Sequence, residues 1–412
     1  MKVKVYGNKK VSGKVRVSGS KNAALPIICA SLLNKNKVVL KNVPRISDVF
    51  DIINILKYLD CKIKFKRNTL IIDSANLNYK PLLLEECQKI RASYYFVGIF
   101  LSIYNKCEIL LPGGCNIGKR PIDYHLKAFS DMGYIYTIED NVLNVRLDKE
   151  LSNIDICISD KSVGASINAI LASTKFKKAK LSNLIIEPEC EGLIKFLNIM
   201  GYNYTIHNDE VTIKSFINND QKVKYRIIPD RIEAMTFTVI GLLCGKLKIK
   251  KCNPNHLLFP LNILVKNSFK IKINKNSLYV YKSVGNQINI ETDIYPGFPT
   301  DLQSIFGVLA SQTNDNSQIV ENIFENRMQI YYDLIKSGIR YNVKDNIVDI
   351  VPGKVKSANY KSYDLRHGAA EIILSLIGDK SSVIENFEVV LRGYEDLLRK
   401  LRRIGVKIEK IT

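Results

Sequence analysis

Residues 193–202 read Leu-Ile-Lys-Phe-Leu-Asn-Ile-Met-Gly-Tyr, which is an amphipathic helix pattern that closes on a glycine and continues into a strand. The pattern occurs six times along the chain, and each copy closes on a small residue. A residue that closes a helix often has positive φ, which costs little energy when there is no Cβ. The six closing positions are Cys61, Gly133, Gly201, Ser268, Gly338 and Gly405, in steps of 72, 68, 67, 70 and 67 residues.

Each copy also carries a second helix that is apolar on almost every side, so it is predicted to be buried, whereas the helix of the closing pattern has one polar face. Short strands are predicted between the two helices and after the helix of the closing pattern, which makes each copy a βαβαββ-like unit. The expected starts of the buried helices lie near Asn22, Arg91, Gly164, Glu233, Asp301 and Arg366.

Repeats of about 20–50 residues usually stack into linear solenoids. Steps of 67 to 72 residues are longer, so they favour closed globular domains of three units each. The sequence therefore predicts an α/β fold with two domains and a boundary near Pro229, before the fourth unit. Two similar domains without any chemistry in their loops are the plain structural alternative.

The charge of the chain points to an anionic partner. Its 412 residues include 61 Lys and Arg against 40 Asp and Glu, for a net charge of +21. A nucleic acid, an anionic membrane surface or a polyanionic small substrate would each suit this charge. However, 46 of the cations are lysine and only 15 are arginine, so a solvated lysine-rich surface explains much of the excess equally well. A hydrophobic content of 46% excludes the disordered classes.

The cysteines and the apolar segments suggest a cytoplasmic protein. The nine cysteines are scattered and form no Cys-x-x-Cys pair, which argues against a disulfide framework and against a zinc ribbon. Residues 1–6 alternate like a strand and lack the apolar core of a signal peptide. The most apolar segment, residues 235–244, is far shorter than the roughly 20 residues that span a bilayer.

One glycine-rich connection, Leu111 to His125, has the composition of a mobile loop that closes over a ligand. Within it, Lys119 and Arg120 are placed to bind an anion and to lower the pKa of Cys115. The plain alternative is that Cys115 is an inert packing residue, as most cysteines are. The other eight cysteines lie in helix or strand patterns and are expected to be inert.

Several predicted helix starts carry polar or charged residues. Lys21-Asn22 opens the first buried helix, where backbone N–H groups favour an anion, although capping explains it equally well. Arginine at such a start opposes the helix dipole, so Arg91 and Arg366 are better explained by a ligand. The remaining candidates are Ser162, Val163, Gly164 and Asp301 at helix starts, and Arg327 and Arg392 in loops after strands.

Seven ordered motifs across the whole chain resemble the UDP-N-acetylglucosamine 1-carboxyvinyltransferase family, the enolpyruvyl transferases of peptidoglycan synthesis within the EPSP synthase superfamily. Together they are far more specific than any one of them. The motifs are Gly19-Ser-Lys-Asn-Ala-Ala-Leu-Pro26, Ile90-Arg-Ala-Ser93, Leu111-Pro-Gly-Gly-Cys-Asn-Ile-Gly-Lys-Arg-Pro-Ile-Asp123, Phe298-Pro-Thr-Asp-Leu-Gln303, Phe324-Glu-Asn-Arg327, Asp364-Leu-Arg366 and Arg392-Gly-Tyr-Glu395.

The resemblance implies two inside-out α/β domains with the active site in the cleft between them. It implies an N-terminal domain of residues 19–228 that carries the Cys115 loop, and a C-terminal domain of residues 1–18 and 229–412. The implied reaction moves the enolpyruvyl group of phosphoenolpyruvate to the 3′-hydroxyl of UDP-N-acetylglucosamine and releases phosphate, through a tetrahedral ketal. The implied partners are these two small molecules, without nucleic acid, membrane, metal or organic cofactor.

The resemblance also assigns roles to residues. Cys115 matches the proton donor, which is also the thiol that fosfomycin attacks, and Asp301 matches the group that accepts the hydroxyl proton or orients the hydroxyl. Arg327 and Arg366 match positions around phosphoenolpyruvate. Lys21, Arg120 and Arg392 match phosphate contacts, and the positions around the nucleotide sugar are Asn22, Arg91, Pro121, Ile122, Asp123, Tyr124, Ser162, Val163, Gly164, Asp301 and Ile323.

Three residues depart from the family pattern. Tyr124 replaces an aliphatic or amide residue and is placed to stack on uracil, a gain of about 1–3 kcal/mol by analogy with base stacking on aromatic side chains. Met235 stands where glycine is usual, and His367 stands where a small residue is usual; neither is expected to touch a motif residue.

Three other functions remain open from the sequence. They are the related transferase that acts on 3-phosphoshikimate, a nucleic-acid-binding protein that uses the net positive charge, and a catalytically silent relative. The Cys115 loop and Ser162-Val-Gly164 argue against the first, and no interleaved basic and aromatic strand pattern supports the second. An intact set of motifs does not by itself exclude the third.

Overall fold

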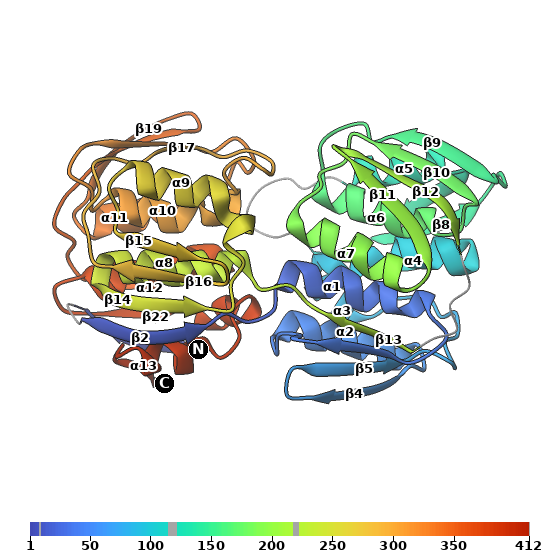
Figure 1. The fold of residues 1–412 in the computed structure, drawn as a ribbon, viewed down its shortest axis with the longest axis horizontal. Coiled ribbons are helices and arrows are strands. Elements are labelled where there is room, and N and C mark those ends of the chain that lie inside the picture. Colours follow the sequence, from blue (N-terminus) through green and yellow to red (C-terminus); the bar gives the residue numbers. More distant parts are fainter. Residues whose placement is uncertain (8–9, 114–121, 217–221, 412) are drawn as a thin grey trace. The chain divides into compact units, whose positions relative to one another are not determined.

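The structure is a computed structural model that describes residues 1–7, 10–113, 122–216 and 222–411. The described chain divides into two compact units (Figure 1). The C-terminal unit contains residues 1–18 and the described residues from 229 onward, and the N-terminal unit contains the described residues between 19 and 228. Each unit has its own core of buried apolar side chains.

Each repeat contributes one buried inner helix and one outer helix, as the hydrophobic patterns predict. All residues of α8 are buried, for example, because that helix is apolar on nearly every side. The inner helices are α1 (Lys21–Ala30), α4 (Tyr95–Tyr104), α6 (Val163–Ser173), α8 (Arg231–Cys244), α10 (Gln303–Ala310) and α12 (Leu365–Ile377). The outer helices are α2 (Ser47–Tyr58), α5 (Asp123–Asp131), α7 (Pro188–Ile199), α9 (Leu258–Lys266), α11 (Gln329–Lys336) and α13 (Leu397–Arg403).

In the described chain, shorter helical segments lie between these twelve helices along the sequence. A separate short helix, α3 (Glu85–Lys89), precedes the second repeat. Single 3-10 turns lead into α4 and α10, so the predicted helix starts at Arg91 and Asp301 lie in these turns rather than in the α-helices. The 3-10 segments are Ser31–Leu33, Arg91–Tyr94, Pro254–Leu257, Thr300–Leu302 and Phe387–Arg392.

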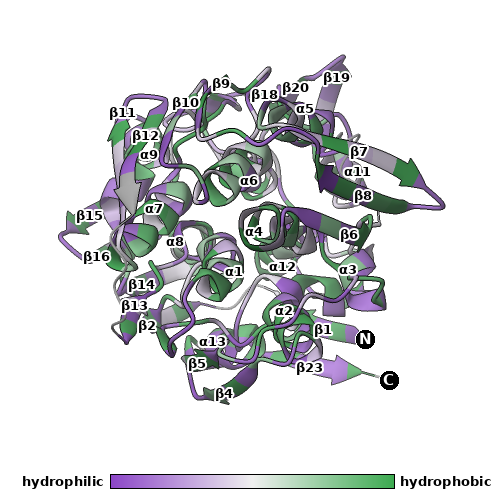
Figure 2. Cartoon of the chain, turned by 90° about the vertical axis from the view of Figure 1, so that its right-hand side faces the viewer, coloured by the Kyte–Doolittle hydropathy of each residue, from purple (hydrophilic) through white to green (hydrophobic). Residues whose placement is uncertain are grey.

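The described part of the N-terminal unit has three sheets, which enclose the inner helices. Figure 2 shows α1, α4 and α6 near the middle, with strands toward the rim. Two of the sheets have one parallel edge strand, and in the third a parallel bridge between Leu82 and Ile109 takes that place. In sheet order the strands are β13 (Val223–Arg226), β3 (Val38–Lys41), β5 (Thr69–Asp73) and β4 (Lys62–Lys66); β9 (Asn153–Cys157), β10 (Lys178–Ser182), β12 (Glu210–Phe216) and β11 (Tyr202–His207); and β6 (Lys106–Leu110), β8 (Val142–Leu147) and β7 (Tyr134–Glu139).

The described part of the C-terminal unit repeats this arrangement with three four-stranded sheets. Each has a parallel edge strand followed by antiparallel neighbours. The N-terminal strand β1 lies inside the last of them, between β22 and β23. In sheet order the strands are β2 (Val11–Arg16), β14 (Gly245–Lys250), β16 (Ser277–Tyr281) and β15 (Ile271–Asn274); β17 (Asn289–Glu291), β18 (Ser317–Val320), β20 (Ile347–Val351) and β19 (Arg340–Lys344); and β21 (Tyr360–Lys361), β22 (Ser381–Glu385), β1 (Lys2–Tyr6) and β23 (Ile408–Ile411).

Each unit contains one edge strand that, in chain order, comes just before the first helix of the other unit. Strand β2 precedes α1 in the sequence but pairs with β14 of the fourth repeat, with Val15 opposite Ile249. Strand β13 precedes α8 but pairs with β3 of the first repeat, with Val223 opposite Val38. The first repeat of each unit therefore obtains its parallel edge strand from the segment ahead of the other unit's first helix.

The closing residues have positive φ in five of the six repeats, from 67° at Ser268 to 103° at Gly201. Glycine is required at position 133, because a Cβ there would lie 2.2 Å from the carbonyl oxygen of Lys149. In the first repeat the predicted position is wrong by one residue, since Asp60 has the positive φ of 64° and Cys61 is buried behind it. Aspartate enters the left-handed region more readily than most residues, because its short polar side chain forms local hydrogen bonds.

Among the described residues, no helix combines the length and the apolar character that crossing a membrane requires.

Candidate active site

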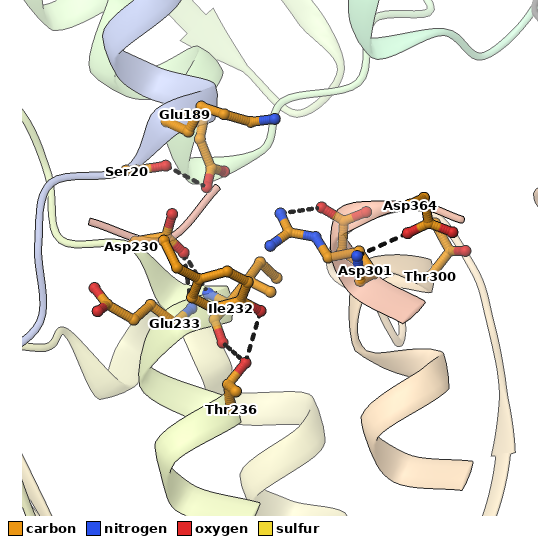
Figure 3. Close-up of polar contacts among 12 residues, drawn as sticks. Ser20, Glu189, Asp230, Ile232, Glu233, Thr236, Thr300, Asp301 and Asp364 are labelled. Atoms are coloured by element: carbon orange, nitrogen blue, oxygen red, sulfur yellow. Dashed lines mark hydrogen bonds and ion pairs between the residues drawn. The ribbon is translucent and has the colours of Figure 1, made fainter. Parts of the chain in front are cut away.

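Asp301 of the C-terminal unit lies between two arginine side chains. Its Oδ1 accepts a hydrogen bond from Nη1 of Arg327 at 2.9 Å, and its Oδ2 accepts one from Nη2 of Arg366 at 2.7 Å. The side chains of both arginines are 5% exposed, whereas that of Asp301 is 25% exposed. The structure thus brings three of the predicted site residues into direct contact. Asp301 stands beside Thr300 on a turn just before α10 (Figure 3).

The two guanidinium groups decide the protonation of Asp301. Burial alone would raise the pKa of this carboxyl, but the charges of Arg366 and Arg327 outweigh burial and hold the pKa well below its ordinary value. The same ion pair holds the pKa of Arg366 above its ordinary value, although burial opposes this. Asp301 is therefore an ionised carboxylate and a weak base, which suits orienting a hydroxyl better than removing a proton from it.

Arg366 is held in place by the first turn of α12. Asp364, labelled in Figure 3, caps this helix. Its Oδ1 accepts hydrogen bonds from the backbone N–H groups of Arg366 at 2.7 Å and His367 at 3.1 Å. The expectation that His367 touches no motif residue is therefore wrong, because Asp364 belongs to the motif Asp364-Leu-Arg366. Asp301 and Asp364 also explain part of why an arginine is tolerated at this helix start.

Arg327 is positioned through Glu321, a residue that the sequence did not reveal. The Glu321 carboxylate accepts hydrogen bonds from the Thr300 hydroxyl at 2.9 and 3.0 Å, and from the backbone N–H groups of Ile323 at 2.9 Å and Phe324 at 3.1 Å. The Thr300 hydroxyl in turn lies 3.0 Å from Nη1 of Arg327. Glu321 is 3% exposed and directly follows a strand, which was the only available sequence signal.

The two arginines have hydrogen-bonding capacity that Asp301 does not use. The Nε atoms of Arg327 and Arg366 are buried and have no hydrogen-bond partner among the described residues. A buried donor without a partner costs about 1–3 kcal/mol, which an anionic ligand oxygen would offset. Planar guanidinium groups suit the paired oxygens of a carboxylate or a phosphate. Arg392, also in this unit, ends the 3-10 segment that follows β22 and is partly buried.

In the N-terminal unit, Lys21 begins α1 and lies close to an acidic side chain. Its Nζ is 3.3 Å from Oδ2 of Asp48, and its side chain is 13% exposed. Ser20 caps the helix, since its hydroxyl accepts a hydrogen bond from the N–H of Ala23 at 3.4 Å. The capping interpretation of this helix start is therefore confirmed, whereas anion binding at Lys21 and Asn22 stays a prediction.

The start of α6 has a similar arrangement. Ser162 caps α6 by accepting a hydrogen bond from the N–H of Ala165 at 3.3 Å, and Val163 is the first residue of the helix. Glycine gives the least crowded packing at position 164, because a Cβ there would lie only 3.0 Å from the ring of His125. That ring is held by Asn168, whose Nδ2 lies 2.9 Å from Nδ1 of His125. The neighbouring helix α5 begins at Asp123, directly after Ile122.

Tyr124 is anchored by a carboxylate. The hydrogen bond between its hydroxyl and Asp160 raises the pKa of Tyr124 and lowers that of Asp160. Arg91 lies in the same unit, at the start of the turn that leads into α4. The structure thus places all the described candidates of the N-terminal unit at helix starts, whereas Cys115, Arg120 and Pro121 lie outside the described residues.

The eight described cysteines differ sharply in exposure. Cys157 is exposed, and the other seven are buried. Burial raises the pKa of these buried thiols, to about 12 for Cys61 and Cys87 and to about 11 for Cys252. They are therefore poor nucleophiles, because the thiolate is the reactive form.

One sheet face combines lysine and tyrosine, contrary to the expectation that no basic and aromatic strands interleave. On the outer face of the sheet β2-β14-β16-β15, Tyr279 stands between Lys248 and Lys272 in the cross-strand register. Both tyrosines already contact lysine ammonium groups, however: Nζ of Lys248 donates a hydrogen bond to the Tyr279 hydroxyl and lies 4.4 Å from the ring centre, and Nζ of Lys246 lies 5.2 Å from the ring centre of Tyr281. These contacts compete with the stacking that single-stranded nucleic acids need.

Comparison with known proteins decides which family this is. Residues 5–401 match the model of EPSP synthase (3-phosphoshikimate 1-carboxyvinyltransferase). The chain belongs to the EPSP synthase family. This confirms the resemblance inferred from the seven motifs.

Relatives at higher identity carry a more specific name within this family. A protein of Pelagibacter ubique is 37% identical, with all of both chains covered, and one of Thermotoga maritima is 35% identical over 100% of this chain and 99% of its own. Both are UDP-N-acetylglucosamine 1-carboxyvinyltransferases, and the chain belongs with them.

Solved structures confirm the fold of this family member. The enolpyruvyl transferase NikO from Streptomyces tendae superposes with a TM-score of 0.89 at 18% identity, over 99% of this chain and 98% of that one. EPSP synthase from Acinetobacter baumannii superposes with a TM-score of 0.78 at 14% identity, with both chains fully covered. The predicted α/β fold of repeated units is thus confirmed.

Proposed function

We propose that this enolpyruvyl transferase moves the enolpyruvyl group of phosphoenolpyruvate to the 3′-hydroxyl of UDP-N-acetylglucosamine and releases phosphate. The observation that carries the proposal is the group of Asp301, Arg327 and Arg366. It combines an ionised carboxylate with two buried guanidinium groups whose Nε donors have no partner in the described part of the chain. Such a group suits a substrate that carries both a carboxylate and a phosphate, next to a hydroxyl that must be oriented.

The proposed reaction is an addition followed by an elimination. In the addition, the sugar oxygen bonds to C2 of phosphoenolpyruvate, its proton leaves, and C3 gains a proton, which gives a phosphate-bearing ketal. In the elimination, C3 loses a proton and the C2–O bond to phosphate breaks. Cys115 supplies the proton to C3, and Asp301 orients the hydroxyl. Because the pKa of Asp301 is low, catalysis depends more on positioning and on stabilising charge than on base strength.

The remaining candidates are proposed to bind the substrates, without a metal or an organic cofactor. The cations at the phosphate and carboxylate of phosphoenolpyruvate are Lys21, Arg120, Arg327, Arg366 and Arg392. Tyr124 is proposed to stack on uracil, with its hydroxyl held by Asp160. The other positions proposed around the nucleotide sugar are Asn22, Arg91, Pro121, Ile122, Asp123, Ser162, Val163, Gly164, Asp301 and Ile323.

The proposal also covers the roles of the two parts of the chain and their cellular context. Residues 19–228 form the domain that carries the Cys115 loop, and residues 1–18 with 229–412 form the second domain. The names of the relatives support a role in peptidoglycan synthesis, hence in cell-wall growth and division. We propose that the protein acts in the cytoplasm and is a target of fosfomycin through Cys115.

A phosphate-release assay tests the choice of substrate. With phosphoenolpyruvate as donor, we expect phosphate release with UDP-N-acetylglucosamine, and none with 3-phosphoshikimate or without an acceptor. Mass spectrometry of the product should show the enolpyruvyl ether of the nucleotide sugar. Release only with 3-phosphoshikimate would replace the proposed substrate, and release with neither acceptor would favour a catalytically silent relative.

An oligonucleotide-binding measurement tests the absence of a nucleic-acid partner. We expect fluorescence anisotropy with a labelled single-stranded RNA to show binding at low salt only, because lysines attract phosphates but the tyrosine side chains already contact ammonium groups. Binding that persists at physiological salt and is lost in Tyr279→Ala would contradict this expectation. Glu409→Gln, an exposed substitution on β23, is the matched control.

A further inference from the structure

A buried cluster of His367, Asp333 and Glu371 joins helices α11 and α12. Nε2 of His367 lies 2.9 Å from Oδ2 of Asp333, and Nδ1 of His367 lies 3.6 Å from Oε1 of Glu371. The three side chains are at most 2% exposed. Oε1 of Glu371 is buried without a hydrogen-bond partner among the described residues, while its Oε2 accepts one from the Ser362 hydroxyl.

The residues of this cluster are close in the chain to the two arginines that hold Asp301. Arg366 immediately precedes His367 at the start of α12, and Arg327 stands two residues ahead of α11, the helix that carries Asp333. The bond between His367 and Asp333 therefore links the two helices next to the two guanidinium groups on Asp301. A small shift of α12 along α11 would change the distance between Arg327 and Arg366.

We propose that His367 is a positioning residue, which fixes α12 against α11 through Asp333 and Glu371 and so sets how Arg366 and Arg327 meet Asp301. The inference rests on the proposed function, because phosphoenolpyruvate is the ligand whose binding would report this geometry. His367 acts through Arg366 and does not itself touch the substrate in this proposal.

The charges around His367 make this arrangement depend on one proton. Lys336 of α11 donates a hydrogen bond to Oδ1 of Asp333 at 2.8 Å, so the ionised Asp333 is balanced by Lys336. The pair of His367 and Glu371 is electrically neutral only while it holds one titratable proton. That proton is either on the carboxyl of Glu371 or is the second ring proton of His367. Loss of that proton leaves one net negative charge in a site at most 2% exposed, which is costly. The other groups that face the pair are Asp364, Tyr363, Ser362 and Tyr360.

The pKa values place the loss of this proton near neutral pH. Burial raises the pKa of Glu371 to about 7 from an ordinary 4.5. Burial lowers the pKa of His367, but the bond to Asp333 and the charge of Glu371 outweigh burial and give a net rise. Both groups bind a proton more tightly in the folded state than in the unfolded state, so their contribution to the free energy of unfolding falls as pH rises through about 7.

The geometry favours this role over a metal site. One ligand atom from each of the three residues lies within 4.8 Å of the others, but the two nitrogens of His367 face different carboxylates, Nε2 toward Asp333 and Nδ1 toward Glu371. The backbone N–H of Tyr363 also approaches Nδ1 at 3.3 Å, and Lys336 occupies the other oxygen of Asp333. The observed contacts therefore describe hydrogen bonds and charge balance within the protein.

The test compares the affinity for phosphoenolpyruvate in Glu371→Gln, His367→Gln and the wild type at pH 6.5 and pH 8.5. Glutamine at 371 stays neutral, so we expect that variant to keep its affinity at high pH, while the wild type loses about tenfold, a change of about 1.4 kcal/mol. We expect His367→Gln to bind about tenfold more weakly at both pH values. Titration calorimetry with phosphoenolpyruvate measures binding without turnover, and KM against kcat is measured in parallel.

Matched controls and an independent signal make the outcome decisive. Glu409→Gln is an exposed substitution in the same unit and should follow the wild type. The chain has four histidines, so the NMR resonance of His367 is assigned by its loss in His367→Gln, and its apparent pKa should shift in Glu371→Gln. The affinity from calorimetry and the apparent pKa of His367 from NMR do not require enzymatic turnover, so they separate this inference from the proposed substrate choice.

Two results would overturn the inference. The first is the same pH dependence of phosphoenolpyruvate affinity in the wild type and Glu371→Gln, together with an unshifted His367 resonance. The second is a stoichiometric divalent cation that the wild type retains and folded His367→Gln loses, which would make the cluster a metal site. If no phosphate is released with UDP-N-acetylglucosamine but the pH difference in affinity is present, the proposed function fails and the inference holds.

Discussion

Replacing Asp301 with asparagine is expected to lower kcat about 10²- to 10³-fold, the usual cost of removing one preorganised polar group from an active site. The ionised carboxylate that orients the hydroxyl is lost, while Arg327 and Arg366 keep their positions against Thr300 and the first turn of α12. Both guanidinium groups then lose a competing anion. We therefore expect KM for phosphoenolpyruvate to stay the same or to fall, which assigns the loss to the transition state.

Steady-state kinetics at several pH values provide the measurement. Because the pKa of Asp301 is held far below its ordinary range, this residue should contribute no pH dependence to wild-type activity near neutrality. Asp349→Asn, on an exposed position of β20, is the control for the substitution itself. Wild-type kcat in Asp301→Asn with a native melting temperature would exclude Asp301 from the reaction.

Replacing Cys115 with serine is expected to abolish most product formation, while the nucleotide sugar still binds. A serine hydroxyl is a much weaker acid than a thiol, and positioned proton transfer is usually worth about 10²–10⁴ in rate. Phosphate release and titration calorimetry with UDP-N-acetylglucosamine measure the two effects separately. The same variant should form no fosfomycin adduct, which intact-mass spectrometry would detect in the wild type.

Cys157→Ser is the matched control, because Cys157 is the exposed cysteine among those described. Burial raises the pKa of the other described thiols, so they should react slowly with both fosfomycin and alkylating reagents. Normal turnover in Cys115→Ser would refute its role as the proton donor. A fosfomycin adduct found on another cysteine would move the reactive thiol elsewhere.

Patterns within single repeats were readable from the sequence, because they depend on local physics. The apolar surface of α6 and α8 predicted their burial, and the glycines at 133, 201, 338 and 405 predicted positive φ at the ends of helices. In the first repeat the predicted position of positive φ was wrong by one residue, since Asp60 and not Cys61 has the left-handed conformation. Aspartate is common in many other settings, so it marks this conformation far less clearly than glycine does.

The exchange of edge strands was not readable from the hydrophobic patterns; only the family resemblance implied it, by placing residues 1–18 with the C-terminal domain. Strands β2 and β13 stand in the same place relative to their following helices as any other edge strand. Their pairing with β14 and β3 depends on which sheet has a free edge, which is a property of the assembled chain. Hydrophobic alternation predicts that a strand forms, but it does not name its partner.

The sequence by itself determined the sixfold α/β repeat, the family and the identity of most candidate residues, because these depend on the order and spacing of residue types. Only the tertiary structure decided which charges meet. It placed Arg327 and Arg366 on Asp301, supported Arg327 through Glu321, and enclosed His367 between Asp333 and Glu371. Charge strength and protonation depend on distance and burial. His367 and Glu371 are neighbours on one helix, but Asp301 reaches its two arginines, and His367 reaches Asp333, only when helices far apart in the chain pack together.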